Sequence, residues 1–116
     1  MKKLTSIAAT AALATGMLLS TNLWAQADGL ISVASPRSAA ETMTRLESIV
    51  KERGLNVFAR IDHAAGATKI GKTLRPTELL IFGNPQGGTP LMECAQTAGI
   101  DLPLKALVWT NDAGKV

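Results

Sequence analysis

The pattern of apolar and polar residues after position 27 predicts a chain that alternates between strands and helices. The clearest element is an amphipathic helix over residues 39–53, with Ser38 and Glu41 at the spacing of a capping box. Gly54 is placed to end this helix. On its polar side, residues four apart predict two ion pairs, Glu41–Arg45 and Glu47–Lys51.

Strands are predicted where β-branched and apolar residues alternate or run together between turn residues. The predicted strands cover residues 29–35, 55–62, 77–82 and 104–110. In the second strand, one face is expected to hold Val57, Ala59 and Ile61, and the other Phe58, Arg60 and Asp62. Residues 63–74 favour a short helix that two glycines weaken.

A glycine-rich stretch separates the strand at 77–82 from a second predicted helix at residues 90–98. Gly87 and Gly88 allow backbone angles that a Cβ disfavours, and Thr89 before Pro90 is typical of a helix start. The helix is expected to turn inward Leu91, Cys94, Ala95 and Ala98. Converging N–H groups at this junction predict an anion site; the alternative is a tight turn that needs glycine only for its geometry.

The chain begins as secretory signal peptides do. Two lysines at positions 2 and 3 precede an apolar stretch, and Ala25 and Ala27 form a small-x-small pair. We expect cleavage after Ala27, with Ala25 as the alternative, and a periplasmic or secreted mature protein. A retained membrane anchor is the competing interpretation, but the apolar stretch is shorter than the roughly 20 residues that span a bilayer. No stable membrane insertion is expected after cleavage.

Removing residues 1–27 leaves one domain at residues 28–116. Two of the 12 basic residues leave with the leader, so 10 basic residues face 9 acidic ones and the net charge falls from +3 to +1. Cys94 is the one cysteine, and a small buried residue is the simplest interpretation of it. The spacing of histidine, cysteine and carboxylates fits no metal site, and no cofactor is expected.

Residues 111–114 predict a hairpin turn close to the last residue, Val116. No strand follows that turn, so the strand at 104–110 is expected to form an open sheet edge. We therefore expect the domain to be truncated at its C-terminal end. An open edge can pair with a second copy of the chain, so a homodimer is also expected as a partner state.

Four ordered segments resemble domain-of-unknown-function family 302, the DUF302 family. These are Val57–Ala67, Leu74–Pro85, Gly88–Met92 and Asp101–Lys105. The resemblance covers roughly residues 31–116. It implies an α+β domain with a curved antiparallel sheet and helices packed on one face, similar to one half of the TATA-binding protein. It implies no activity, because none is established for the family.

Asp62 and His63 are the candidates for catalysis, because a carboxylate beside a histidine can orient its ring for proton transfer. In an enzyme, Arg75 would hold an anionic group and Asn84 would position the substrate. The alternative for His63 is a structural role in its loop. The residues expected to bind a ligand are Arg75, Asn84, Gly87, Gly88 and Thr89.

Three functions therefore stay open: a non-catalytic module that binds a small ligand or a protein, an enzyme that uses His63 as general acid or base, and a structural homo-oligomer. The first is preferred, because the catalytic inventory is thin. Nucleic acid is not expected as a partner, since the mature chain is nearly neutral and lacks stacked aromatic residues.

Overall fold

The structure, a computed structural model, describes residues 29–116, and residues 33–116 form one unit. The elements follow the order α1 (Ala39–Glu52), β1 (Asn56–Asp62), α2 (His63–Lys69), β2 (Thr77–Gly83), α3 (Pro85–Cys94), a 3-10 helix η1 (Gln96–Ile100) and β3 (Leu104–Trp109). The predicted α+β class is confirmed. The predicted signal peptide, residues 1–27, lies outside the described residues.

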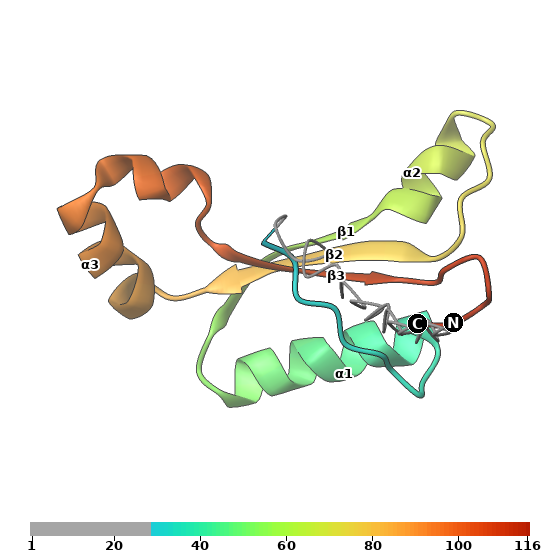
Figure 1. Ribbon diagram of the computed structural model, residues 1–116, viewed down its shortest axis with the longest axis horizontal. Coiled ribbons are helices and arrows are strands. Elements are labelled where there is room, and N and C mark those ends of the chain that lie inside the picture. Colours follow the sequence, from blue (N-terminus) through green and yellow to red (C-terminus); the bar gives the residue numbers. More distant parts are fainter. Residues whose placement is uncertain (1–28) are drawn as a thin grey trace, which may run out of the picture. The chain divides into compact units, whose positions relative to one another are not determined.

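The three strands form an antiparallel sheet in the order β1-β2-β3. Figure 1 shows α1 lying along one face of this sheet, while α2 and α3 extend beyond its opposite ends. The register of β1 and β2 shows why the two helices lie at opposite ends. Asn56 pairs with Gly83 at the α3 end, and Asp62 pairs with Glu78 at the α2 end. Residues that follow β1 and residues that follow β2 are therefore held at opposite ends of the sheet.

Helix α1 forms as its sequence predicts. Ser38 Oγ accepts a hydrogen bond from the Glu41 N–H at 3.2 Å, and the Ser38 N–H donates to Glu41 Oε2 at 3.1 Å. These bonds satisfy backbone donors of the first turn and so favour the helix start at Ala39. The predicted Glu41–Arg45 pair is not formed, because the Glu41 carboxylate is engaged by Ser38, whereas Lys51 Nζ binds Glu47 Oε1 at 2.6 Å.

The core lies between α1 and the sheet. Met43 and Leu80 are fully buried, and the other buried apolar residues are Ala39, Val50 and Val108. A polar layer at the edge of this core also ties helix to sheet, since Arg60 binds Glu78 of β2 at 2.6 Å and Glu47 of α1 at 3.3 Å. Hydrogen bonds that Arg60 donates to the Glu78 carboxylate raise the pKa of the guanidinium, so this residue stays charged.

A β-bulge interrupts β1 between Val57 and Ala59, which changes the face that each residue occupies. Val57 packs against the core and Arg60 reaches α1, so Ala59 and Ile61 lie on the other face. The strict alternation predicted for residues 57–62 is therefore wrong at Val57, which shares a face with Arg60 and not with Ala59 and Ile61. By register, the face away from α1 is largely apolar and carries Ala59, Ile61, Leu79, Ile81, Leu107 and Trp109.

The strand predicted at residues 29–35 is not formed, since none of these residues is assigned to a strand. Its last residue nevertheless makes a strand-like bond, from the Ser35 N–H to the Val116 carbonyl oxygen at 2.8 Å. The turn predicted at residues 111–114 is present, with the Gly114 N–H donating to the Asn111 carbonyl oxygen at 3.0 Å. The alternating pattern of residues 29–35 was thus insufficient, because a strand also needs a partner strand.

Candidate functional site

The glycine-rich stretch is the beginning of α3 rather than a loop before it. Asn84 is the N-cap, and its Oδ1 accepts a hydrogen bond from the Gly87 N–H at 2.8 Å. Pro85 occupies the first helical turn, where its missing N–H removes no hydrogen bond. The predicted start at Pro90 with Thr89 as N-cap is therefore wrong by five residues. Asn-Pro has the same capping chemistry as Thr-Pro and comes first in the chain.

Gly87 and Gly88 are not needed for unusual backbone angles, since neither has a positive φ. The Gly87 N–H donates to the Asn84 side chain and the Gly88 N–H to the Asn84 carbonyl oxygen at 3.2 Å. Both N–H groups already have an acceptor inside the protein. They are therefore not available to bind the anion that the sequence predicts. Gly88 is not required for space either, because an added Cβ would meet Leu102 and Met92 at ordinary contact distances.

The same residues form the wall of a cavity at the α3 end of the sheet. Its volume is about 610 Å³, which is within the usual range of small-molecule sites. The helix supplies residues from Asn84 to Met92, and the sheet supplies Phe58, Gly83 and Leu104. Residues before β3 close a third side, among them Gly99, Leu102 and Pro103. Four of the predicted ligand-binding residues, Asn84, Gly87, Gly88 and Thr89, therefore lie together.

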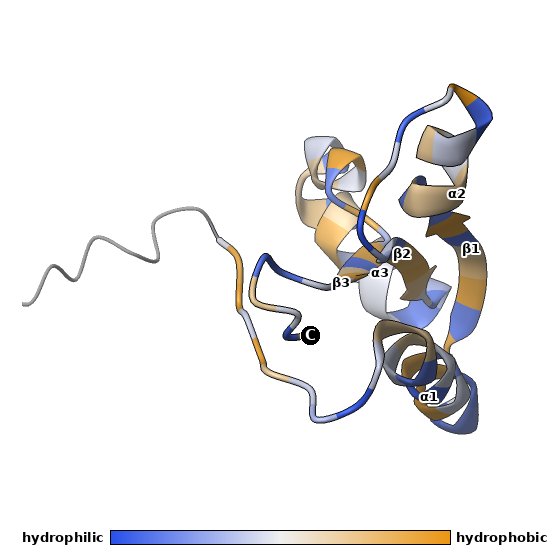
Figure 2. Ribbon diagram, turned by 90° about the vertical axis from the view of Figure 1, so that its right-hand side faces the viewer, coloured by the Kyte–Doolittle hydropathy of each residue, from blue (hydrophilic) through white to orange (hydrophobic). Residues whose placement is uncertain are grey.

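Apolar side chains around this cavity are incompletely covered. The exposed fractions are 57% for Phe58, 55% for Leu91 and 54% for Leu104. Helix α3 has no buried residue and packs mainly against η1, so its apolar positions are not used in the core. The predicted inward stripe is wrong for Leu91, Cys94 and Ala95, all of which are exposed. Figure 2 shows hydrophobic colour on parts of α3 as well as on the strands.

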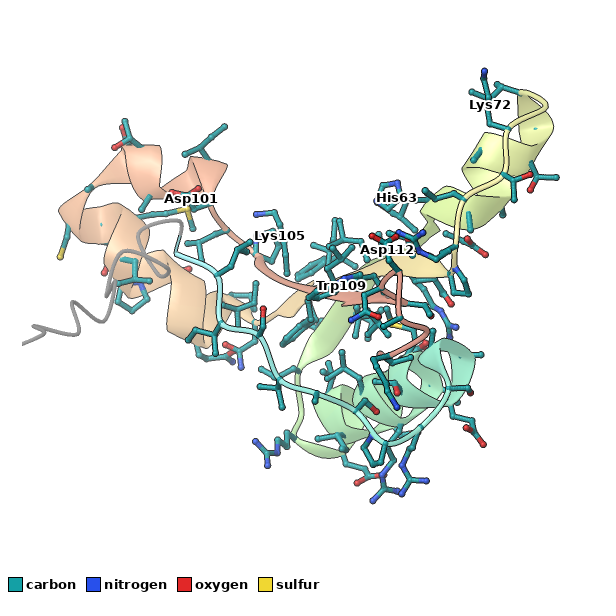
Figure 3. The ribbon with its side chains drawn as sticks, turned by 45° about the vertical axis from the view of Figure 1, so that its right-hand side comes forward. His63, Lys72, Asp101, Lys105, Trp109 and Asp112 are labelled. Atoms are coloured by element: carbon teal, nitrogen blue, oxygen red, sulfur yellow. The ribbon has the colours of Figure 1, made fainter. Side chains whose placement is uncertain are left out.

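His63 and Asp62 lie at the other end of the sheet, where α2 begins (Figure 3). The Asp62 side chain is the N-cap of α2 and accepts the Ala65 N–H at 2.8 Å. His63 is exposed, and within residues 29–116 its side chain makes no hydrogen bond or ion pair. Asp62 is therefore committed to the helix cap, and the structure shows no Asp–His pair.

Arg75 also lies away from the cavity. Its Nε donates to the Thr110 carbonyl oxygen at 3.0 Å, and its Nη1 binds Asp112 Oδ1 at 2.6 Å. These contacts join the segment before β2 to the turn after β3. The cavity wall includes Asn84 but not Asp62, His63 or Arg75, so the residues proposed for an enzyme do not share this cleft.

Sequence analysis missed the apolar half of the site. Phe58 was assigned by alternation to a mixed polar face, and the bulge that turns it toward the cavity has no clear sequence signal. Met92 and Leu104 looked like ordinary helix and strand residues. One usable signal was Phe58 itself, a large aromatic residue in register with Arg60 and Asp62.

Two features are absent from residues 29–116. Histidine, cysteine and carboxylate side chains form no group of three or more that could hold a metal ion. No helix in this part of the chain has the length and apolar character needed to cross a membrane.

Comparison with known proteins identifies relatives. The family model described as "Domain of unknown function DUF302" matches residues 31–116. A solved structure of an uncharacterised conserved DUF302 protein from Bacillus stearothermophilus has a TM-score of 0.64 and 25% sequence identity. The match covers 72% of this chain and 65% of that one.

Curated relatives carry the name of a fluoride-specific ion channel. The chain is 53% identical over 88 residues to fluoride-specific ion channel FluC 1 from Brucella suis, and equally to FluC 1 from Brucella abortus. The match covers 76% of this chain but 35% and 33% of those proteins. The chain thus spans about a third of the length of the curated relatives that it matches.

Proposed function

This chain belongs to the DUF302 family, and on that premise we propose that it is a non-catalytic module that binds a small, mainly apolar ligand. The observation that carries the proposal is the 610 Å³ cavity between α3 and the sheet. Its wall combines exposed apolar side chains with two polar ones, Asn84 and Thr89, which is the usual composition of a ligand site.

The proposal also accounts for the incomplete packing of α3. Leaving Phe58, Leu91 and Leu104 more than half exposed forgoes stabilisation by burial, which is worth about 25 cal/mol for each Å² of apolar surface. A ligand in the cavity would cover part of that surface and recover part of that stabilisation. Binding would then order the α3–η1 segment against the sheet.

A thermal-shift experiment with neutral aromatic and aliphatic compounds tests this function. A compound present at about 100 times its dissociation constant stabilises the fold by about 2.7 kcal/mol, which gives a readily measured rise in Tm. Phe58→Ala should abolish that rise, while Phe82→Ala serves as a control for general destabilisation, since Phe82 lies outside the cavity and packs on the core. No stabilising compound in a broad apolar collection would contradict the proposal.

The fluoride-channel name of the relatives suggests a second test. We propose that the shared third of those proteins is a binding module and that fluoride is not its ligand. In the described part of the chain, no residue lining the cavity carries a charge, which is unfavourable for a buried anion. Sodium fluoride should therefore leave Tm where the same concentration of sodium chloride leaves it.

We propose that the module acts in the periplasm or outside the cell. The leader-like composition of residues 1–27 supports this location. Mass spectrometry of the protein recovered from the periplasm should give an N-terminus at Asp28. Recovery from the cytoplasm with Lys2 and Lys3 still attached would contradict it.

We also propose that the chain self-associates through β3. This strand is at the edge of the described sheet. The Thr110 N–H donates to the Pro76 carbonyl oxygen, so every second N–H group counted back from Thr110 points toward β2. The N–H groups of Lys105, Leu107 and Trp109 then point away from β2. Light scattering should show a dimer, and a monomer at high concentration would contradict this proposal.

A further inference from the structure

The hydrogen-bonding groups of the two polar side chains in the cavity wall restrict the chemistry of the ligand. Asn84 Oδ1 accepts the Gly87 N–H at 2.8 Å, and this bond fixes which end of the amide faces the helix. The Nδ2 atom therefore faces the other way, and in residues 29–116 no hydrogen bond from it is found. It carries two N–H donors and no acceptor.

The charge of the wall restricts the ligand further. Lysine, arginine, aspartate and glutamate are absent from the cavity wall within residues 29–116. A charged ligand group would lose water there without gaining an opposite charge, which is unfavourable. An uncharged acceptor, by contrast, would satisfy Asn84 Nδ2 at the cavity edge, and the Thr89 hydroxyl could bind the same group or its neighbour.

We infer that the ligand is an uncharged molecule with an apolar body and a carbonyl-type acceptor that Asn84 Nδ2 binds. This inference rests on the proposed function, since it needs the cavity to be a ligand site. The apolar body lies against Phe58, Leu91 and Leu104. Ketones, esters and amides fit this description, whereas carboxylates and amines do not.

Three probes with a phenyl group and a four-carbon chain test the chemistry: butyrophenone, 4-phenylbutyrate and 4-phenylbutylamine. They carry a neutral acceptor beside the ring, an anion at the chain end and a cation at the chain end, respectively. Titration followed by NMR should show butyrophenone binding at least about tenfold more tightly than either charged probe, the effect of roughly one hydrogen bond to a neutral partner.

Asn84→Asp provides the sharpest variant. A carboxylate still accepts the Gly87 N–H and so keeps the cap of α3, but it replaces the two donors by an acceptor. Butyrophenone affinity should fall at least about tenfold, and 4-phenylbutylamine affinity should rise. Asn84→Ser also keeps a cap and replaces the two Nδ2 donors by one hydroxyl on a shorter side chain without adding charge, so it should weaken butyrophenone binding without favouring the amine.

The outcomes separate this inference from the proposed function. Equal affinity for the three probes, or butyrophenone binding unchanged in both variants, would overturn the inference and leave an apolar binding module. Failure of every probe to bind would overturn the inference together with the cavity as a ligand site. A preference for butyrophenone that both variants remove supports the assignment to Asn84.

Discussion

The side of the sheet that α1 covers and the end of the sheet where α3 lies are built in opposite ways. On the α1 side, Met43 and Leu80 are fully buried, and Arg60 joins helix and sheet through two carboxylates. At the α3 end no helical residue is buried, and Leu91 is 55% exposed. In both helices the side chain of the N-cap residue accepts a backbone hydrogen bond, so the two regions differ in packing and not in local helix signals.

This difference assigns separate tasks to the two regions. Tertiary packing supplies most of the stability of a short helix, so the α1 side determines whether the domain folds. The α3 end contributes less to folding and leaves apolar surface beside a cavity. We therefore expect substitutions on the α1 side to change stability, and those at the α3 end to change binding.

The largest expected effect is on the core. Met43→Ala should lower the free energy of unfolding by about 2 to 5 kcal/mol, because it leaves a cavity in a fully buried position. Leu91→Ala removes a comparable side chain that is more than half exposed and should cost less than about 1 kcal/mol. Urea denaturation of the two variants measures both values, and similar losses would remove the distinction between the regions.

The next effect is at the start of α3. Asn84→Ala removes the cap oxygen for the Gly87 N–H and should cost about 1 kcal/mol. Thr89→Ala is the matched control: Thr89 lies inside the helix, where alanine has the higher propensity, so stability should not fall. Thermal unfolding of the two variants measures both changes in stability. If the helix instead began at Pro90, Thr89→Ala would be the more destabilising of the two.

A smaller gain is expected at Gly88. A Cβ added there would lie 3.5 Å from Leu102 Cδ1 and 3.9 Å from Met92 Cε, which are ordinary contacts. Gly88→Ala should therefore stabilise α3 by up to about 1 kcal/mol through helix propensity. At Gly87 the added Cβ would be 3.3 Å from Asn84 Oδ1, so Gly87→Ala should give less. Equal increases in Tm for Gly88→Ala and Gly87→Ala would show that the Asn84 side chain does not restrict a side chain at residue 87.

The smallest effect concerns pH on the α1 side. Hydrogen bonds from Lys51 and then Arg60 hold the pKa of Glu47 below its usual 4.5. Because the folded pKa is the lower one, this stabilisation is present above about pH 4.5 and is lost as pH falls through the folded value. Glu47→Gln should thus lower the urea midpoint near neutral pH, and the difference from wild type should shrink as the pH falls below about 4.5. A difference independent of pH would contradict the role of the carboxylate.

Local signals made the α1 region predictable from sequence. Ser38 and Glu41 are three residues apart in a standard capping box, and the apolar positions that follow occur at helical spacing. Strands β1, β2 and β3 were also found within one or two residues, because each is a distinct apolar run. Resemblance to DUF302 then led to the fold class that the structure shows.

The α3 end was harder to predict, for reasons that particular residues show. Asn84 and Thr89 each precede a proline and compete as the N-cap, and the choice depends on how the helix meets residues 99–102. The bulge at Phe58 arises from pairing with β2, which is not visible in β1 alone. Proximity of Asn84 to Leu104 and separation of Asn84 from His63 are both consequences of sheet register.

The central claim is that ligand binding is confined to the α3 end, and an amide-resolved NMR titration with butyrophenone tests it most directly. We predict chemical-shift changes at Gly83, Asn84, Gly88, Met92 and Leu104, with α1 residues and His63 unaffected. Changes centred instead on Ile61, Leu107 and Trp109, on the open face of the sheet, would contradict the claim, as would changes spread along α1.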